Sequence, residues 1–447
     1  MAEESVDVVI LGASGFTGKY VLREILKFVS PSNAPLRKIA IAGRSKKKLA
    51  AALTWASGGL NASVSSSIPI YEADVSNVES LVAVCKKTKL LLNCVGPYRK
   101  YGRPVVEACV EAGVDYLDIT GEPDFMERME HLYHEKAMQT GSLVVSACGY
   151  DSIPAEFGVI HNTQQWEPPS VPITVDSYLV LESTGKRIKG NIGTWETLVL
   201  GVANQADLQT LRKSRPRRQR PQIPRSSSKK PGLIHWEGNA GGWAVRLPSA
   251  DATVVRRTHA TMVENPNGLF NASGEFLSSN GQPWTSIKPV HYGCYVIQKS
   301  VIGIIGMFVI GLLLVFFTRF KFGEKLLIQH PELFSLGIFQ KEGPSEEEID
   351  SASFKMYFVG RGCSNSTQHT LSVKFDQEIV TRVSGPEIGY ITTPITLIQA
   401  ALIVLDERHN LPKGGVLTPG SVFGGTDYLQ RLQKNGISFD VISSKKL

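Results

Sequence analysis

The first third of the chain alternates short apolar runs with segments of helical periodicity. Segments 16–29 and 103–114 repeat apolar residues at the spacing of amphipathic helices. The six apolar runs are VDVVILG at 6–12, RKIAIAG at 37–43, SIPIYEAD at 67–74, KLLLNCVG at 89–96, DYLDITG at 115–121 and GSLVVSA at 141–147. Strands that alternate with helices are typical of βαβ units. The pattern predicts an α/β fold, with a Rossmann doubly wound parallel sheet over residues 1–150 that binds ligands at the carboxyl ends of its strands.

The pattern changes after Pro154. The runs at 173–183 and 354–362 are longer and alternate apolar with polar residues, which favours an antiparallel or mixed sheet. We therefore predict a second, α+β substrate domain over residues 151–390. The remaining segment, 391–447, contains two helical patterns separated by a Gly/Pro-rich connector, and we expect its helices to pack back on the Rossmann domain.

Residues 301–317 form an uncharged apolar run, with Lys299 before it and Arg319 and Lys321 after it. Seventeen residues is the lower limit for crossing a bilayer, and a buried core helix is the alternative. A crossing would leave the rest of the chain on the opposite side of the membrane from the cofactor domain. We therefore expect one apolar membrane-associating helix that lies in a single leaflet or a lipid monolayer.

Charge is concentrated in one segment. The 447 residues are 42% hydrophobic and 20% charged, as in a folded globular protein, and the formal charge is +7. Residues 212–230 alone carry nine Lys or Arg and no acid, so the rest of the chain is slightly acidic. This excludes a nucleic-acid surface spread over a domain. Segment 212–232 is Pro/Arg/Ser-rich and predicts a mobile basic loop, which either attracts anionic lipid head groups or is simply solvated.

The cysteines and the first residues bear on location. Six cysteines are scattered without a C-x-x-C pair, which favours a reducing, intracellular compartment. Residues 2–7 are acidic and lead directly into the first apolar run, so we expect no cleavable presequence. The spacing of His and Cys matches no metal motif, and we predict no metal site.

The strongest chemical signal is the segment LGASGFTG, in which Gly12, Gly15 and Gly18 stand between a predicted strand and a predicted helix. This context is that of a dinucleotide-binding turn, in which the glycines allow a tight turn, close approach of a pyrophosphate and close helix packing. The alternative is a glycine-rich turn without a ligand. The predicted binding residues of this turn are Gly12, Ala13, Ser14, Gly15, Phe16, Thr17 and Gly18.

The second predicted strand ends in AGRSKKK. An acid at this place binds the ribose of NAD, whereas a cation accepts the 2′-phosphate of NADP. Arg44, with Ser45 and Lys46 behind it, therefore favours NADP(H), and NAD(H) stays the alternative. The alternative for these residues is a run of surface cations at the start of a helix. We expect Asp74 near the adenine and the loop of Val95, Gly96 and Pro97 beneath the nicotinamide ribose.

Five segments together resemble one family. They are GASGFTG, AGRS, NCVGPY, DYLDITGE and CGYDSIPAEFG, in this order and spacing, with GTWET at 193–197 and GGVLTPGSVFGGT at 414–426 in addition. This set is similar to the saccharopine dehydrogenase-like oxidoreductases, including their eukaryotic membrane and lipid-droplet members, and to mycobacterial trans-acting enoyl reductases. The segment at 148–158 departs from the G-x-D-P-G of enzymes that act on saccharopine.

The resemblance implies a nicotinamide-dependent reductase with Tyr98, Tyr150 and Asp151 near the hydride. Each has a structural alternative, such as ring packing for Tyr150 and helix capping for Asp151. The first functional hypothesis is hydride transfer to a hydrophobic or lipid-linked substrate at a lipid-droplet or mitochondrial membrane, with homo-oligomerisation left open. The second is a saccharopine-type imine oxidoreductase in mitochondria. The third is a nucleotide-binding scaffold or redox sensor without turnover.

Overall fold

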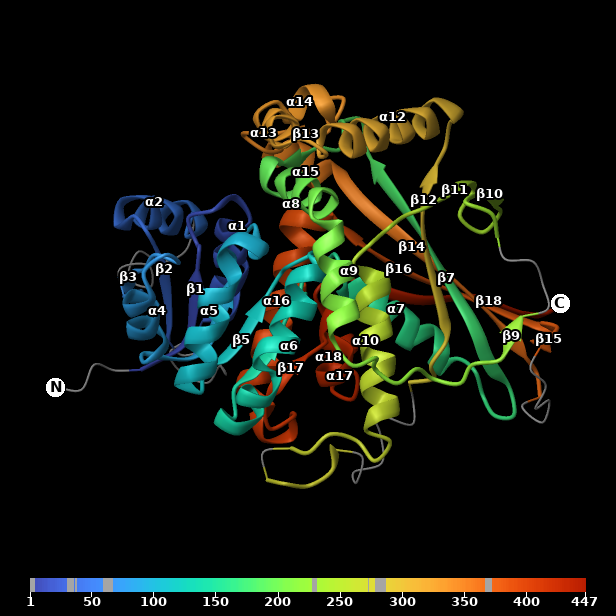
Figure 1. The fold of residues 1–447 in the computed structure, drawn as a ribbon, viewed down its shortest axis with the longest axis horizontal. Helices are drawn as coiled ribbons and strands as arrows, with labels where there is room; N and C mark the ends of the chain where they lie inside the picture. Colours follow the sequence, from blue (N-terminus) through green and yellow to red (C-terminus); the bar gives the residue numbers. More distant parts are fainter. Residues whose placement is uncertain are drawn as a thin grey trace. The chain divides into compact units, whose positions relative to one another are not determined.

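The chain folds into two compact units, each built around a seven-stranded sheet (Figure 1). The computed structural model describes residues 5–29, 36, 38–58, 67–226, 231–271, 273–277, 287–365 and 372–447. Unit 1 comprises residues 1–150, 269–279 and 389–428, and unit 2 comprises residues 151–268, 280–388 and 429–447. Each unit therefore draws on segments that are far apart in the sequence.

Unit 1 confirms the predicted Rossmann fold. Its strands are all parallel, in the order β17-β6-β5-β4-β1-β2-β3, so the strand order reverses between β1 and β4. Strands covered on both faces read as continuous apolar runs, and every residue of β2 is buried. The strands are β1 Val6–Leu11, β2 Ile39–Gly43, β3 Ile70–Glu72, β4 Thr88–Asn93, β5 Asp115–Asp118, β6 Leu143–Val145 and β17 Gly415–Leu417.

The helices of unit 1 include a long core helix from the C-terminal third of the chain. The run Ile388–Asn410 is the one helix among the described residues that is long and apolar enough to cross a membrane, but 78% of its apolar window is buried inside the protein. It is therefore a core helix. The helices are α1 Phe16–Ile25, α2 Lys46–Ala56, α4 Val78–Cys85, α5 Tyr98–Ala112, α6 Pro123–Thr140, α16 Thr393–Glu407 and α17 Pro419–Phe423, with a π-helical turn at Ile388–Thr392 and 3-10 turns at Leu26–Phe28 and Arg408–Asn410.

Unit 2 contains a mixed sheet in the order β10-β11-β12-β7-β14-β16-β18. The β12–β7 pair is parallel and the other pairs are antiparallel. Its elements are α7 Ile153–Gln164, β7 Val171–Ser183, β8 Gly190–Asn191, α8 Ile192–Ala203, α9 Gln205–Ser214, β9 Arg225–Ser226, β10 Ile234–Glu237, β11 Gly242–Arg246, α10 Asp251–Glu264, β12 His291–Gln298, α12 Val301–Phe317, α13 Lys321–Gln329, α14 Pro331–Phe334, β13 Phe339–Gln340, α15 Glu346–Ser351, β14 Ala352–Cys363, β15 Ser372–Val373, β16 Gln377–Pro386 and β18 Ser438–Lys446; α18 Tyr428–Lys434 begins at the last residue of unit 1.

The C-terminal segment differs from the predicted pair of helices. Part of the predicted connector forms β17, which pairs with β6 and extends the parallel sheet. After α18 the chain forms β18, which pairs with β16 at the edge of the second sheet. Residues 429–447 therefore belong to unit 2, and the expectation that all of 391–447 packs on the Rossmann domain is wrong for this part.

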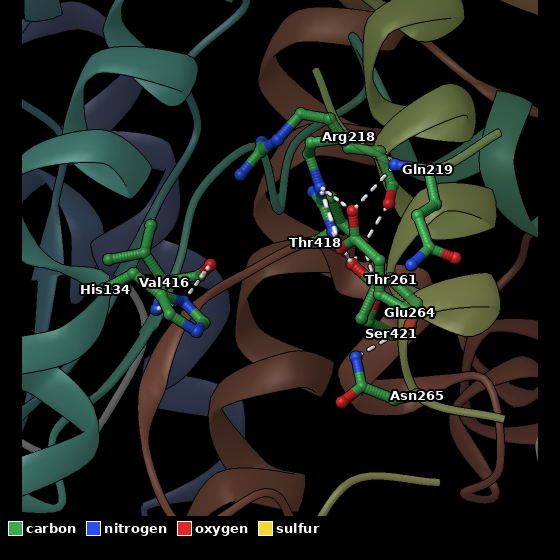
Figure 2. A network of polar contacts seen from close by, with 10 residues as sticks. His134, Arg218, Gln219, Thr261, Glu264, Asn265, Val416, Thr418 and Ser421 are labelled. Atoms are coloured by element: carbon green, nitrogen blue, oxygen red, sulfur yellow. Dashed lines mark hydrogen bonds and ion pairs between the residues drawn. The ribbon is translucent and has the colours of Figure 1, made fainter. Parts of the chain in front are cut away.

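The basic segment is docked on unit 2 over its described part, and this corrects the predicted mobile loop. Residues 212–214 end α9. The Arg218 guanidinium donates to Glu264 at 2.6 Å and to Thr261 at 2.9 Å, and the Gln219 N–H donates to Glu264 at 3.0 Å (Figure 2). Further along, Ile223 packs against a small apolar cluster, and β9 pairs with β15. Residues 227–230 lie outside the described residues.

Helix α12 lies on the surface of unit 2. Leu314 on its inner side packs with Trp195 and Val199 of α8 and with Leu327 of α13. Its other side is exposed, and we call this the apolar face of α12: Val301, Ile302, Ile305, Phe308, Val309, Leu312, Val315 and Phe316. Helix α12 therefore leaves a contiguous apolar patch exposed on unit 2.

Candidate nucleotide-binding site

The glycine turn follows β1 and leads into α1. Gly12 has φ +86°, and a Cβ atom there would lie 2.7 Å from Cγ2 of Val95. A Cβ atom on Gly18 would lie 2.1 Å from the Gly12 carbonyl oxygen, which is too close for any side chain. The turn and the helix start are therefore in direct contact, as the prediction from the glycine spacing requires.

The start of α1 suits an anion. Helix α1 begins at Phe16, Gly15 precedes it without a side-chain cap, and its first turn carries no acid. Unpaired N–H groups and the helix dipole favour negative charge at such a position. Ala13 is buried, whereas Ser14 and Gly15 are exposed and Thr17 is partly exposed. The exposed backbone of this turn can therefore receive a diphosphate.

An aromatic cluster fixes the first residue of α1. The Phe16 ring stands edge-on to Tyr390 at 4.8 Å between ring centroids, and Tyr20 lies 5.5 Å from Tyr390. The Lys19 ammonium lies 4.7 Å from the Phe16 centroid and 4.4 Å from that of Trp55. The Phe16 ring therefore anchors the start of α1, and a contact of Phe16 with the nucleotide stays a prediction.

The second loop of the site follows β4, on the other side of the point where the strand order reverses. The Cys94 N–H donates to the Leu11 carbonyl at 2.9 Å, and the Val95 N–H donates to the Asn93 side chain at 3.0 Å. The Gly96–Pro97 peptide bond is cis, and Pro97 precedes α5. Gly96 is exposed. The loop of Val95, Gly96 and Pro97 thus borders the glycine turn.

Arg44 stands directly after β2 and is exposed. Within the described part of the chain it makes no hydrogen bond or ion pair. Ser45 caps α2 by accepting a hydrogen bond from the Lys48 N–H, and Lys46 lies 3.9 Å from Glu72 with both side chains largely exposed. Of the three predicted 2′-phosphate residues, Arg44 is the one whose charged group is available.

Two carboxylates lie near Arg44: Glu72, the last residue of β3, which was not anticipated, and Asp74, which was predicted to lie near the adenine. Glu72 pairs in register with Gly43, at the end of β2. Asp74 accepts hydrogen bonds from the Ser76 N–H at 2.9 Å and the Ser76 hydroxyl at 2.7 Å, which lower its pKa, and the Arg44 charge acts in the same direction. Asp74 therefore stabilises the turn before α4. It also lies close enough to Arg44 for the two opposite charges to interact.

The Tyr98 side chain stabilises the second loop of the site through a hydrogen bond to its backbone. Its side chain is buried, and its hydroxyl donates to the Asn93 carbonyl at 2.7 Å. Burial and the Asp118 charge hold its pKa well above the usual range. The hydroxyl is therefore engaged by the backbone of the loop, and the position of Tyr98 near the hydride stays a prediction.

The segment DYLDITGE organises the loops around the site. Asp118 is fully buried, and its carboxylate accepts from the N–H groups of Thr120 at 3.0 Å and Ala147 at 2.8 Å. Burial raises its pKa to about 6. Glu122 accepts from the N–H groups at the start of α5, those of Tyr98 at 2.7 Å and Arg99 at 2.8 Å. Both acids therefore accept hydrogen bonds from backbone N–H groups of the loops around the site, a role that the sequence analysis did not predict.

The remaining predicted residues stand at the junction of the two units in the sequence. Tyr150 is the last residue of unit 1 before the junction. It is buried, and its N–H donates to the Thr393 hydroxyl at 3.1 Å. Asp151 is the first residue of unit 2. It does not cap α7, because Ser152 occupies the N-cap position. Asp151 is exposed to solvent, yet the nearby protein atoms desolvate its carboxyl group and raise its pKa.

A second carboxyl group of unit 2 was missed by the sequence reasoning. Asp251 opens α10, which packs against α7. Burial raises its pKa to about 7, and the charges of Asp151 and Glu156 act in the same direction. A carboxyl that keeps its proton near neutral pH can serve as an acid. About a hundred residues separate Asp151 from Asp251, so no local motif joins them.

Comparisons with known proteins identify the family. Residues 8–145 match the model of the saccharopine dehydrogenase NADP binding domain. A probable mitochondrial saccharopine dehydrogenase-like oxidoreductase of Arabidopsis thaliana is 54% identical over 99% of this chain and 98% of that protein. The chain belongs to the saccharopine dehydrogenase-like oxidoreductase family.

Other family members and one solved structure extend this result. The human saccharopine dehydrogenase-like oxidoreductase is 38% identical over 98% of both chains, and a lipid droplet localized protein of Caenorhabditis elegans is 32% identical over 99% of both chains. The apo saccharopine dehydrogenase (L-Glu forming) of Saccharomyces cerevisiae aligns over 98% of this chain and 100% of that chain with a TM-score of 0.51 and 12% identity, which shows a shared fold. The family assignment makes this chain an oxidoreductase with a nicotinamide dinucleotide-binding domain.

Proposed function

We propose that this chain is an NADP(H)-dependent oxidoreductase, held peripherally at a lipid surface, that transfers hydride to a hydrophobic or lipid-linked substrate. The observation that carries the cofactor part is the contact between Gly12 and Gly18, which leaves the acid-free start of α1 open to a diphosphate. When bound, NADPH supplies the hydride. The residues of the chain hold the dinucleotide and provide the proton.

The preference for NADP(H) rests on Arg44, and NAD(H) is the alternative because Glu72 and Asp74 lie close by. We expect Arg44→Ala to weaken NADPH binding by about 1.5–3 kcal/mol, roughly 10- to 150-fold, because a charged hydrogen bond to the 2′-phosphate is lost. NADH binding should change little. Fluorescence titration with both nucleotides measures the two affinities.

Lys47→Ala is the matched control for this test, since Lys47 is an exposed cation in the first turn of α2. It should leave both affinities nearly unchanged. If Arg44→Ala weakened NADH and NADPH equally, the assignment of Arg44 to the 2′-phosphate would be refuted.

The proposed location rests on the apolar face of α12. Eight large apolar side chains are exposed on this helix, and the cations Lys299, Arg319 and Lys321 stand beyond its two ends. Apolar surface between cations suits a membrane or lipid droplet with anionic head groups. The name of the C. elegans relative supports a lipid droplet and that of the A. thaliana relative a mitochondrion. The substrate proposal follows from this location.

The proposed source of the proton is the carboxyl pair of unit 2, Asp151 and Asp251. We expect NADPH oxidation with long-chain enones or imines to slow as the pH rises through about 7, because Asp251 loses its proton there. Asp251→Asn should lower the rate at least about 10-fold and remove this pH dependence, while NADPH binding is retained. Asp207→Asn, which changes a first-turn acid of α9, is the control. An unchanged pH profile in Asp251→Asn would exclude Asp251 as the donor.

A further inference from the structure

A pair of exposed tryptophans stands on the β10–β11 hairpin of unit 2. Trp236 is 58% exposed and Trp243 is 37% exposed, and their rings stand edge to face at 5.7 Å between centroids. Leu233 and Ile234, at the start of the hairpin, are exposed as well. By contrast, Trp166 and Trp195 are fully buried. An exposed aromatic pair at the edge of a sheet marks an interaction surface.

Strand register connects this pair to α12. Trp236 is paired with Trp243, and Trp243 is paired with Gln298, so the three side chains leave the same face of the sheet. The Gln298 amide in turn contacts the Met307 sulfur of α12 at 3.1 Å. In Figure 1 the hairpin lies beside the end of β12 from which the chain enters α12. The tryptophans thus leave the sheet face on which Gln298 contacts α12, close to the start of that helix.

Charge and ring chemistry indicate what covers this surface. Lys299 is exposed between β12 and α12, and Arg319, Lys321 and Lys325 are exposed beyond the other end of the helix. Glu324 is the acid among them and contacts Lys321 at 3.3 Å. Aliphatic side chains bordered by cations complement acyl chains and anionic head groups, and tryptophan is enriched at the boundary between them.

We infer that Trp236 and Trp243 insert into the same lipid surface as α12 and form a second anchor that fixes the orientation of unit 2 on it. This inference rests on the proposed lipid association and adds the residues that set the orientation. One helix alone leaves a body free to rotate about the helix axis. A second contact beside its N-terminus removes that freedom.

The test uses the full-length protein and vesicles of phosphatidylcholine and phosphatidylserine, with and without bromine on the acyl chains. Bromine quenches tryptophans that reach the acyl region. We expect strong quenching in the native protein and loss of most of it in the double variant Trp236→Phe and Trp243→Phe, whereas Trp55→Phe keeps it. Replacing both by Ser should weaken vesicle binding roughly tenfold, because the apolar contact of the rings is lost.

The outcomes separate this inference from the proposed lipid association. Native protein that floats with vesicles without quenching by brominated lipid overturns the second anchor and leaves the α12 contact intact. Quenching that persists in the double Phe variant does the same. Native protein that does not bind vesicles overturns both proposals. A further outcome is that light scattering shows a dimer for the native protein and a monomer for the double Ser variant. If neither protein binds vesicles, the tryptophans contact a second copy of the chain, and the inference is overturned.

Discussion

Gly18→Ala is expected to abolish nucleotide binding. The new Cβ atom would stand 2.1 Å from the Gly12 carbonyl oxygen, and because this neighbour is backbone, the start of α1 must move away from the turn. The N–H groups there then no longer converge on a diphosphate. Loss of two charge-assisted contacts amounts to about 3–6 kcal/mol, roughly 100-fold or more in Kd. Isothermal titration with NADPH and with NADH measures the loss.

The effect should be the same for both nucleotides, since the diphosphate is common to them. Gly201→Ala is the matched control: Gly201 lies in α8, and nothing stands within 4 Å of the added atom. Thermal unfolding without ligand separates lost binding from lost folding, because overpacking here costs about 1–3 kcal/mol. Full NADPH affinity in Gly18→Ala would refute the proposed role of this turn.

Two substitutions on the apolar face of α12 are expected to release the protein from lipid. Ile302 is 82% exposed and Leu312 is 69% exposed, so Asp at either position leaves the packing of the helix intact. In acyl chains each Asp is unfavourable by about 3 kcal/mol at full depth and less near the surface. We expect the double variant to bind vesicles at least tenfold more weakly in a flotation assay.

Leu132→Asp is the control, because Leu132 is an exposed apolar residue on a helix of unit 1. NADPH affinity should be unchanged in all these variants. If the double Asp variant floated with vesicles as well as native protein does, α12 would not be the lipid contact, and the apolar face would need another partner.

The parts of the fold that were predictable are those that local pattern determines. Six apolar runs were predicted as strands, and all six are strands of the parallel sheet, five of them largely buried. The seventh strand, β17, has three residues in a Gly/Pro-rich segment, so it carries no periodicity of its own. Strand β18 ends in the polar sequence SSKK and follows a helix. Both form because long-range pairing satisfies their backbone groups.

The basic segment shows how a single long-range contact overrides composition. Its residues have the low hydrophobicity that favours disorder, yet the bidentate pair of Arg218 with Glu264 holds it on α10. The partner acid lies 46 residues further along the chain. Asp251 was missed because about a hundred residues separate it from Asp151, so no local sequence pattern joins the two carboxyl groups. The glycine turn, by contrast, lies within eight residues, so its tight turn and the close approach of α1 could be predicted from the local sequence.

The position of β17 and α16 in unit 1 determines how this protein can be divided. A fragment that stopped at residue 150 would leave β6 as an open sheet edge and uncover the apolar surface that α16 occupies. The nucleotide-binding unit is thus completed by residues 389–428, which follow most of unit 2 in the sequence. On the ribosome, unit 1 can be completed only after strands β7, β12, β14 and β16 of the second sheet have been synthesised.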